Sequence, residues 1–202
     1  MPIAQHETLI EEGKTLLNNA PQLYIDVDVE ADGKPGHGSL LSIGAIASHG
    51  GVFYIELAPA NKEYIASQRQ FCEDHGLERE RLIREGTEPT EAIRLFGAWT
   101  LNLAHQYEKP PVFSAFNAGF DYGFIDLYMI KAGLDNPYGI APFDLKSAAQ
   151  SLSGNWDWAQ TNKGRLPKAL LPDGDFTHNA LEDAVYQQKI HFALAGLLRS
   201  KS

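Results

Sequence analysis

The stretch that decides the predicted fold is Leu23-Tyr24-Ile25-Asp26-Val27-Asp28-Val29-Glu30. Side chains alternate between the two faces of a β-strand, so Asp26, Asp28 and Glu30 share one face and the apolar residues share the other. A carboxylate buried without a partner is very costly, and carboxylates crowded on one face need a cation between them. The stretch therefore predicts a buried strand that serves as a platform for metal ions.

Short turns connect this strand to two more apolar stretches. The acidic strand, predicted at about 22–29, is followed by a Gly- and Pro-rich turn at 32–38 and a second buried strand at 39–47. A tight turn, His49-Gly50-Gly51, then leads into a third strand at 52–57. Short connections favour antiparallel neighbours, so these strands predict a three-strand meander.

Helical periodicity alternates with strands in the rest of the chain. Helices are predicted at 61–70, 77–85, 89–104, 119–132, 144–152 and 178–199, and strands at 112–116 and 139–143. A strand entered after a helix is expected to run parallel to the first strand. We therefore predict an α/β fold with one mixed sheet, in which the antiparallel meander is extended by parallel strands and flanked by helices.

The beginning of the chain predicts a separate amphipathic helix at 3–19, with Leu9, Ile10, Leu16 and Leu17 forming its apolar stripe. The predicted domain organisation is accordingly an N-terminal helix at 1–20 and a single domain at 21–202. We expect the helix to lean on the edge of that domain or on a second subunit, and a homodimer is one expected arrangement.

Composition narrows the class of protein. The chain has 17 Lys and Arg against 26 Asp and Glu, a formal net charge of −9, which argues against coating nucleic acid by bulk charge. This net charge is compatible with an enzyme that binds a short nucleic-acid end through metal ions. We expect no membrane span and no secretion signal, and Cys72 as the single cysteine fits a reducing, cytoplasmic setting.

Three motifs follow in order along the chain. Asp28-Val29-Glu30 can reach one metal cluster from one face of the strand, although a solvated strand end is the alternative. Asn117-Ala118-Gly119-Phe120-Asp121 leads from a buried strand into a helix, where Asp121 could instead serve the helix dipole. In a parallel α/β layout the carboxyl ends of strands meet at one edge, so we expect Asp121 near Asp28 and Glu30.

The third motif is His178-Asn179-Ala180-Leu181-Glu182-Asp183 at the start of the last predicted helix. Asp183 lies about one and a half helical turns after His178. A histidine on the loop before the helix can therefore reach the same site that Asp183 faces. This arrangement suits a metal ligand and a mobile base. The alternative is a loop histidine and an acid on a solvated helix face.

Together the three motifs resemble the DEDD exonuclease superfamily, His-type subgroup, which includes ribonuclease T, oligoribonuclease and proofreading exonuclease subunits. The resemblance runs from about Leu23 to Leu194, and it is most specific at His178-Asn179-Ala180-Leu181-Glu182-Asp183-Ala184. The stretch Leu41-Ser42-Ile43-Gly44-Ala45 is similar to the Ile-Gly-Ala strand that these enzymes carry after the first motif.

The resemblance implies a ribonuclease-H-like fold and a 3′–5′ exonuclease that hydrolyses single-stranded ends of RNA or DNA to mononucleotides. It implies Asp28, Glu30, Asp121 and Asp183 as ligands of two Mg²⁺ or Mn²⁺ ions, with His178 as the general base. Hard cations prefer oxygen ligands, and two such ions stabilise both the attacking and the leaving oxygen of a phosphodiester. A catalytically silent nucleic-acid-binding module on the same fold is the alternative.

Asp26 competes with Asp28 for the first position of this set, because Asp26-x-Asp28 has the same spacing as Asp28-x-Glu30. We prefer Asp28-x-Glu30, since Gly33 follows three residues after Glu30, as in the Asp-x-Glu-x-x-Gly of the family. Asp26 then lies deeper in the strand and requires a partner that the sequence does not identify.

Substrate contacts are predicted from the aromatic and basic residues around these motifs. Phe116, Asn117 and Phe120, with the 33–40 loop, are expected to line the pocket for the terminal nucleotide, although Phe120 could be a core residue. A cluster of Trp156, Trp158, Lys163, Arg165 and Lys168 suits a loop that guides a single strand by stacking and phosphate contacts. The alternative is a surface loop whose tryptophans pack on the domain.

Overall fold

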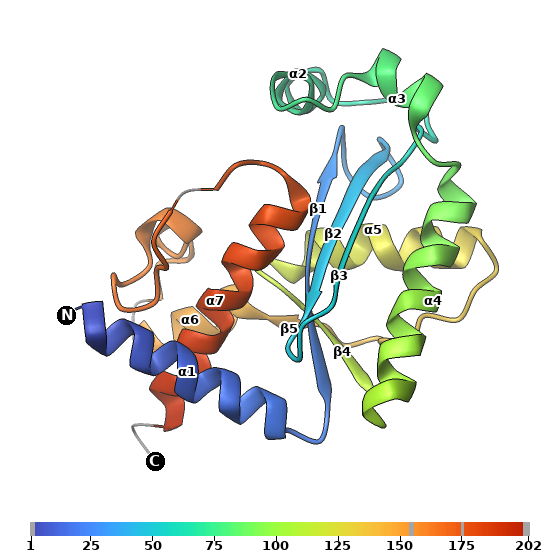
Figure 1. Ribbon diagram of the computed structural model, residues 1–202. Coiled ribbons are helices and arrows are strands. Elements are labelled where there is room, and N and C mark those ends of the chain that lie inside the picture. The colour runs from blue at the N-terminus through green and yellow to red at the C-terminus, as the bar shows by residue number, and fades with distance from the viewer. Residues whose placement is uncertain (1–2, 154–155, 175, 200–202) are drawn as a thin grey trace.

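A mixed five-stranded sheet lies at the centre of the computed structural model, which describes residues 3–153, 156–174 and 176–199 (Figure 1). The meander consists of β1 (Leu23–Ala31), β2 (Leu40–Ala47) and β3 (Val52–Glu56), and both of its pairings are antiparallel. On the other side of β1, the strands β4 (Pro111–Ala115) and β5 (Phe143–Asp144) pair in parallel, which gives the order β3-β2-β1-β4-β5. The predicted mixed sheet is confirmed.

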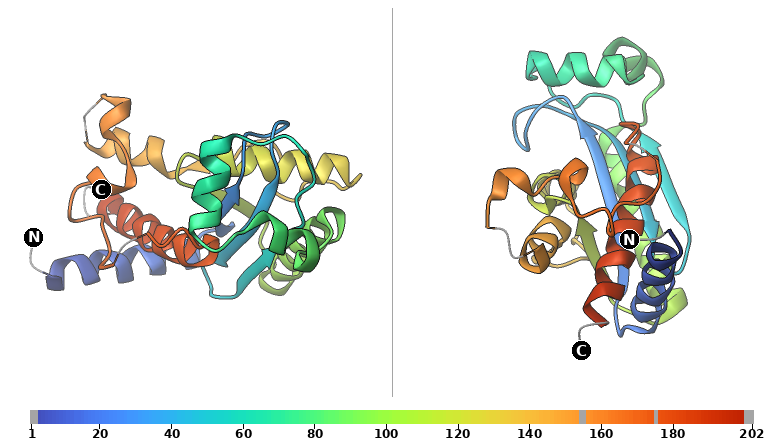
Figure 2. Two further views of the ribbon diagram at one scale, coloured as in Figure 1. Left: turned by 90° about the horizontal axis from the view of Figure 1, so that it is seen from above. Right: turned by 90° about the vertical axis from the view of Figure 1, so that its left-hand side faces the viewer.

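Helices cover both faces of the sheet and one of its ends (Figures 1 and 2). On one face, α7 (Ala180–Arg199) packs against β1 and β2, and α1 (Ile3–Asn19) packs along α7. On the other face lie α4 (Pro89–Tyr107) and α5 (Ala118–Lys131). The short helices α2 (Ala66–Asp74) and α3 (Arg79–Glu85) lie over the end of the sheet where β1 finishes, and α6 (Leu145–Ser153) lies beside β4 and α7.

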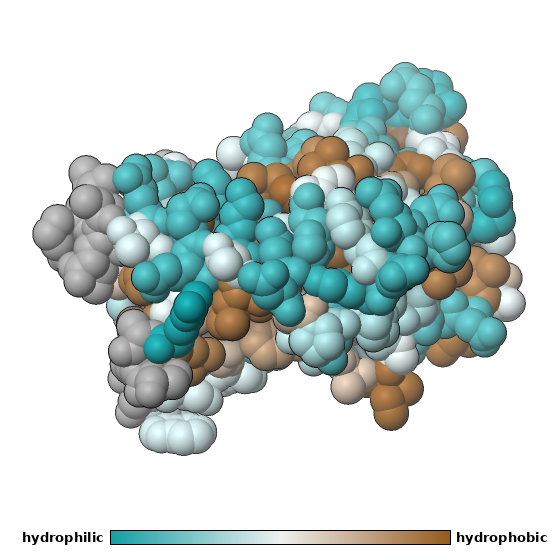
Figure 3. Space-filling model, turned by 60° about the horizontal axis from the view of Figure 1, so that its bottom comes forward, coloured by the Kyte–Doolittle hydropathy of each residue, from teal (hydrophilic) through white to brown (hydrophobic). Residues whose placement is uncertain are grey.

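The main hydrophobic core fills the space between the sheet and the α4–α5 layer. Phe96, Phe113 and Phe124 are fully buried there. The surface at the end of the molecule away from α2 is mostly hydrophilic, and its apolar residues form separate patches (Figure 3). Within the described ranges, no helix has both the length and the apolar character that a membrane span requires.

Helix α1 crosses α7 at a very short distance, and glycine makes this possible. A Cβ atom on Gly13 would lie 1.7 Å from the carbonyl oxygen of Phe192, and one on Gly196 would lie 2.2 Å from that of Leu9. The absence of a side chain at each glycine allows the backbone of the other helix to approach closely. Helix α1 therefore packs directly on the helix that carries Asp183.

Two predicted boundaries are wrong for local reasons. The helix predicted at 61–70 begins only at Ala66, because the preceding backbone is bound to the β1–β2 turn: Asn61 N donates to Ser39 Oγ at 3.0 Å and Ile65 N to Asp32 O at 2.8 Å. In place of the strand predicted at 139–143, the structure has only the short β5, Phe143–Asp144, because Gly139 adopts a φ of 69° in a turn.

Candidate active site

The carboxyl end of β1 opens into a pocket of about 540 Å³. The segments that reach it are far apart in sequence: β1, the β4–α5 junction, the loop before α7 and the first turn of α7. The residues that line it are Asp28, Val29, Glu30, Phe116, Asn117, Phe120, Asp121, Asn162, Lys163, Gly164, Phe176, His178 and Asp183. All five residues predicted as metal ligands or general base therefore lie around one cavity.

Backbone hydrogen bonds hold two of the carboxylates in place. Asp121 lies in the first turn of α5 and accepts a hydrogen bond from Val29 N at 3.0 Å, which ties the start of that helix to β1. Asp183 accepts one from Thr177 N at 3.0 Å, which ties α7 to the turn that carries His178. Each of these carboxylates thus has one oxygen anchored by the chain.

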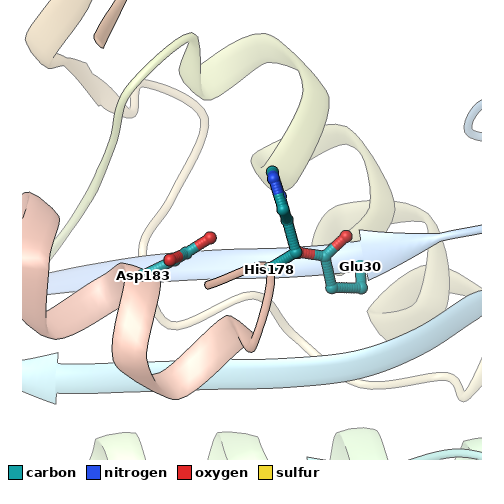
Figure 4. Close-up of side chains that lie close together, drawn as sticks. All are labelled: Glu30, His178 and Asp183. Atoms are coloured by element: carbon teal, nitrogen blue, oxygen red, sulfur yellow. The ribbon is translucent and has the colours of Figure 1, made fainter. Parts of the chain in front are cut away.

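Three ionisable side chains converge in the pocket (Figure 4). Glu30 comes from β1, Asp183 from α7 and His178 from the turn before α7, and one ligand atom of each lies within 4.8 Å of the others. That spacing suits the coordination sphere of a single cation, with oxygen and imidazole nitrogen as donors.

Burial, and then the repulsion between neighbouring carboxylates, disfavours the ionised form of three of the acids. Burial, reinforced by Asp28, Asp183 and Asp121, raises the pKa of Glu30 to about 9. Burial is also the largest cause of the raised pKa of Asp121 and of Asp183, and the charge of Asp28 adds to it in both. A divalent cation would reverse this repulsion, so the donor set fits Mg²⁺ or Mn²⁺, whose binding would release protons.

The position of α7 depends on Gly44 in β2. A Cβ atom on Gly44 would lie 2.1 to 2.2 Å from backbone atoms of Ala180 and Leu181, at the first turn of α7. Because real Cβ contacts are never that short, the absence of a side chain at Gly44 allows the helix to approach the sheet. The Ile-Gly-Ala strand thus brings Asp183 and His178 toward β1.

A polar stripe on α7 fixes the helix against β1 and supplies the missing partner of Asp26. His191 Nδ1 lies 3.0 Å from Asp26 Oδ1, and both side chains are buried. One turn earlier, Gln187 donates to the carbonyl of Val27 at 3.2 Å and accepts from Phe116 N at 2.7 Å. Asp26 is therefore paired beneath the pocket, with a residue 165 positions away in the chain.

The predicted substrate residues separate into two groups. Phe116, Asn117, Phe120 and Lys163 line the pocket, and Phe120 also packs against the main core. Arg165 is not among the described residues that line it, and its guanidinium donates to Gln160 Oε1 at 2.6 Å.

The tryptophans of the predicted guiding loop lie at the surface. Trp156 is 82% exposed, and Trp158 lies under the ammonium of Lys146, which is 3.9 Å from the centre of its ring. Lys168 is exposed as well. The tryptophans therefore do not act as buried anchors of this loop.

Helix α2 and the residue at its C-cap contribute two side chains to the site that no sequence motif identifies. The rings of Phe71 and His75 each lie 4.6 Å from the ring of His178, in edge-to-face geometry. His178 itself adopts a φ of 59°, in the left-handed region. Phe176, on the wall of the pocket, was missed too. Neither Phe71 nor His75 belongs to a motif, and only the fold places them beside His178.

The comparisons with known proteins agree with this geometry. No family model matches the chain. The chain is 34% identical over 183 residues to the 3′-5′ DNA exonuclease Cap18 of Escherichia coli, an alignment that covers 89% of this chain and 95% of the relative.

Two solved structures share the fold at low sequence identity. The nuclease domain of 3′hExo, a DEDDh family member bound to rAMP, is 10% identical with a TM-score of 0.63, covering 89% of this chain and 92% of that one. S. pombe Pop2p, in a Mg²⁺- and Mn²⁺-bound form, is 15% identical with a TM-score of 0.61, covering 93% and 88%. The chain therefore belongs to the DEDD exonuclease superfamily and is a 3′–5′ exonuclease.

Proposed function

We propose that this exonuclease removes mononucleotides from the 3′ end of single-stranded DNA, using two Mg²⁺ or Mn²⁺ ions. The observation that carries the proposal is the meeting of four carboxylates and a histidine from separate segments in one pocket. The DNA substrate is proposed because the E. coli relative is a DNA exonuclease. A silent binding module is less well supported, since it would not require the complete set of acids.

Each residue of the set then has a distinct task. Asp28, Glu30, Asp121 and Asp183 would hold the two ions, and such ions would supply activation of a water and stabilisation of the leaving oxygen in phosphodiester hydrolysis. His178 would accept the proton of the attacking water, because a neutral imidazole is a suitable base near pH 7. The hydrogen bonds to Asp121 and Asp183 orient these carboxylates before the substrate arrives.

Replacing His178 by alanine is expected to lower kcat about 1,000-fold, because a general base contributes roughly 10²–10⁴-fold. Calorimetric titration with Mn²⁺ in the absence of DNA should give a dissociation constant close to that of the unchanged protein. If H178A instead loses Mn²⁺ binding together with activity, His178 is a metal ligand and the role of base falls to another group.

The terminal nucleotide is proposed to lie against Phe116 and Phe120, which line the pocket. Base–aromatic stacking contributes about 1–3 kcal/mol per base, so F120A should raise KM for an oligonucleotide about tenfold and change kcat less. Because Phe120 also packs on the core, the thermal unfolding midpoint of F120A is measured alongside. An unchanged KM in a folded F120A would remove Phe120 from the substrate pocket.

A substrate panel tests the proposed specificity. Single- and double-stranded DNA and RNA of the same sequence, each labelled at the 5′ end, are digested with Mg²⁺ and with Mn²⁺. We expect single-stranded DNA to be shortened one nucleotide at a time and to have the highest kcat/KM. A higher kcat/KM on RNA would refute the DNA assignment and leave the exonuclease assignment intact.

A further inference from the structure

The side chain of Lys163 is largely buried among the carboxylates of the pocket. A residue that only contacted the incoming substrate would be more exposed. Its Nζ is 3.0 Å from Oδ1 of Asp28, and the side chains are only 21% and 13% exposed. The ammonium also lies 4.3 Å from the centre of the Phe176 ring, on the wall of the same pocket. The ion pair and this contact, together with a longer one of 6.0 Å to the ring of Phe116, hold the ammonium among the acids.

Charge explains why a lysine is stable in this position. Four carboxylates line the pocket, and Lys163 is the single lysine or arginine among the described residues that line it. Burial opposes its charge, yet Asp28 and Asp121 outweigh that effect and raise the pKa of the ammonium. Lys163 therefore acts as a counterion for the acids.

The segment that carries Lys163 is anchored independently of this contact. Lys163 belongs to a short 3₁₀ turn, Lys163–Arg165. Two residues that follow the turn in sequence, Leu166 and Leu170, are buried in the hydrophobic cluster shared with α6 and α7. The ammonium is carried on a flexible four-carbon stem. It can consequently leave Asp28 while the turn stays docked.

We propose that Lys163 is a resident cation of the active site, which competes with a divalent ion for Asp28. This inference rests on the proposed metal site. A divalent ion binds a carboxylate oxygen at about 2.0–2.6 Å, so an ammonium hydrogen-bonded to Oδ1 occupies one of the two carboxylate oxygens of Asp28 and places a positive charge where the metal ion would bind. The metal ion that Asp28 would hold must then displace Lys163 in order to bind. A higher concentration of the divalent ion is therefore needed to fill the site.

The test compares Mn²⁺ binding by calorimetry, without nucleic acid, in the unchanged protein and in three variants. K163M keeps an unbranched side chain only one atom shorter than lysine but removes the competing charge, and it should bind Mn²⁺ about tenfold more tightly, since a charged hydrogen bond of this kind is lost from the metal-free state. K163R keeps the charge and should stay within about threefold of the unchanged protein. R165M removes the same charge from an exposed neighbour that contacts Gln160, and should change affinity less than twofold.

Thermal unfolding in EDTA gives a second measurement. K163M should unfold at a lower temperature than R165M, because only K163M leaves the four acids without their counterion, and the stabilisation gained on adding Mn²⁺ should be larger in K163M. Equal Mn²⁺ affinity in K163M and R165M, or weaker binding in K163M, would overturn the proposal. Failure of the unchanged protein to bind Mn²⁺ at all would instead overturn the metal site itself.

Discussion

Replacing Asp183 by asparagine is expected to lower kcat about 1,000-fold, because one metal-binding carboxylate contributes several kcal/mol of transition-state stabilisation through the ion that it holds. Asparagine keeps the shape of the side chain and can still accept the hydrogen bond from Thr177 N. The fold should therefore survive, and the midpoint of thermal unfolding in EDTA should not fall. Initial rates on a labelled single-stranded oligonucleotide measure the effect.

The adjacent acid provides a matched control. Glu182 is exposed, whereas Asp183 is buried against the pocket, so E182Q removes the same charge one residue away. We expect E182Q to keep activity within about twofold. Full activity in D183N, or an equal loss in both variants, would contradict the assignment of Asp183 as a metal ligand.

Replacing Gly44 by alanine is expected to have the second largest effect, although Gly44 does not line the pocket. The added Cβ would overlap backbone atoms of Ala180 and Leu181, so the first turn of α7 must move away from β2. Overpacking of this kind costs about 1–3 kcal/mol of stability. The displaced turn carries Asp183, and a misplacement of about 1 Å can cost roughly 100-fold in rate.

A second glycine controls for the general effect of adding a methyl group. Gly119 lies in the first turn of α5, and a Cβ atom there meets no atom within 4 Å. G119A should retain full activity and gain up to about 1 kcal/mol of stability, because alanine is the better helix former. The contrast is measured by thermal unfolding and by kcat on the same oligonucleotide. A G44A protein that matches G119A in both would refute the role of Gly44.

The fold and the set of acidic residues could be predicted from local sequence because each depends on a short pattern. The alternation from Leu23 to Glu30 has a period that only a strand satisfies, and the short turns after it specify antiparallel neighbours. The order of the motifs then brings Asp121 and Asp183 to the edge where β1 ends. Here the local pattern and the global topology lead to the same answer.

The partners of these residues could not be predicted because they depend on contacts across the chain. Asp26 pairs with His191, which is 165 residues away and lies inside a helix without any motif. Phe71 and His75 contact His178 because the fold places α2 near β1, a contact that no local sequence pattern specifies. Lys163 was predicted to contact phosphate, and its ion pair with Asp28, 135 positions away in the chain, could not be predicted from the local pattern.

The most direct measurement is the release of nucleotides from a single-stranded DNA oligonucleotide that carries its label in the 3′-terminal residue. We expect the label to be released first, as a mononucleotide, in the presence of Mn²⁺ or Mg²⁺, and EDTA to stop this release completely. Release that continues in EDTA, or label that first appears in longer fragments cut from the interior, would contradict a metal-dependent 3′–5′ exonuclease built on Asp28, Glu30, Asp121 and Asp183.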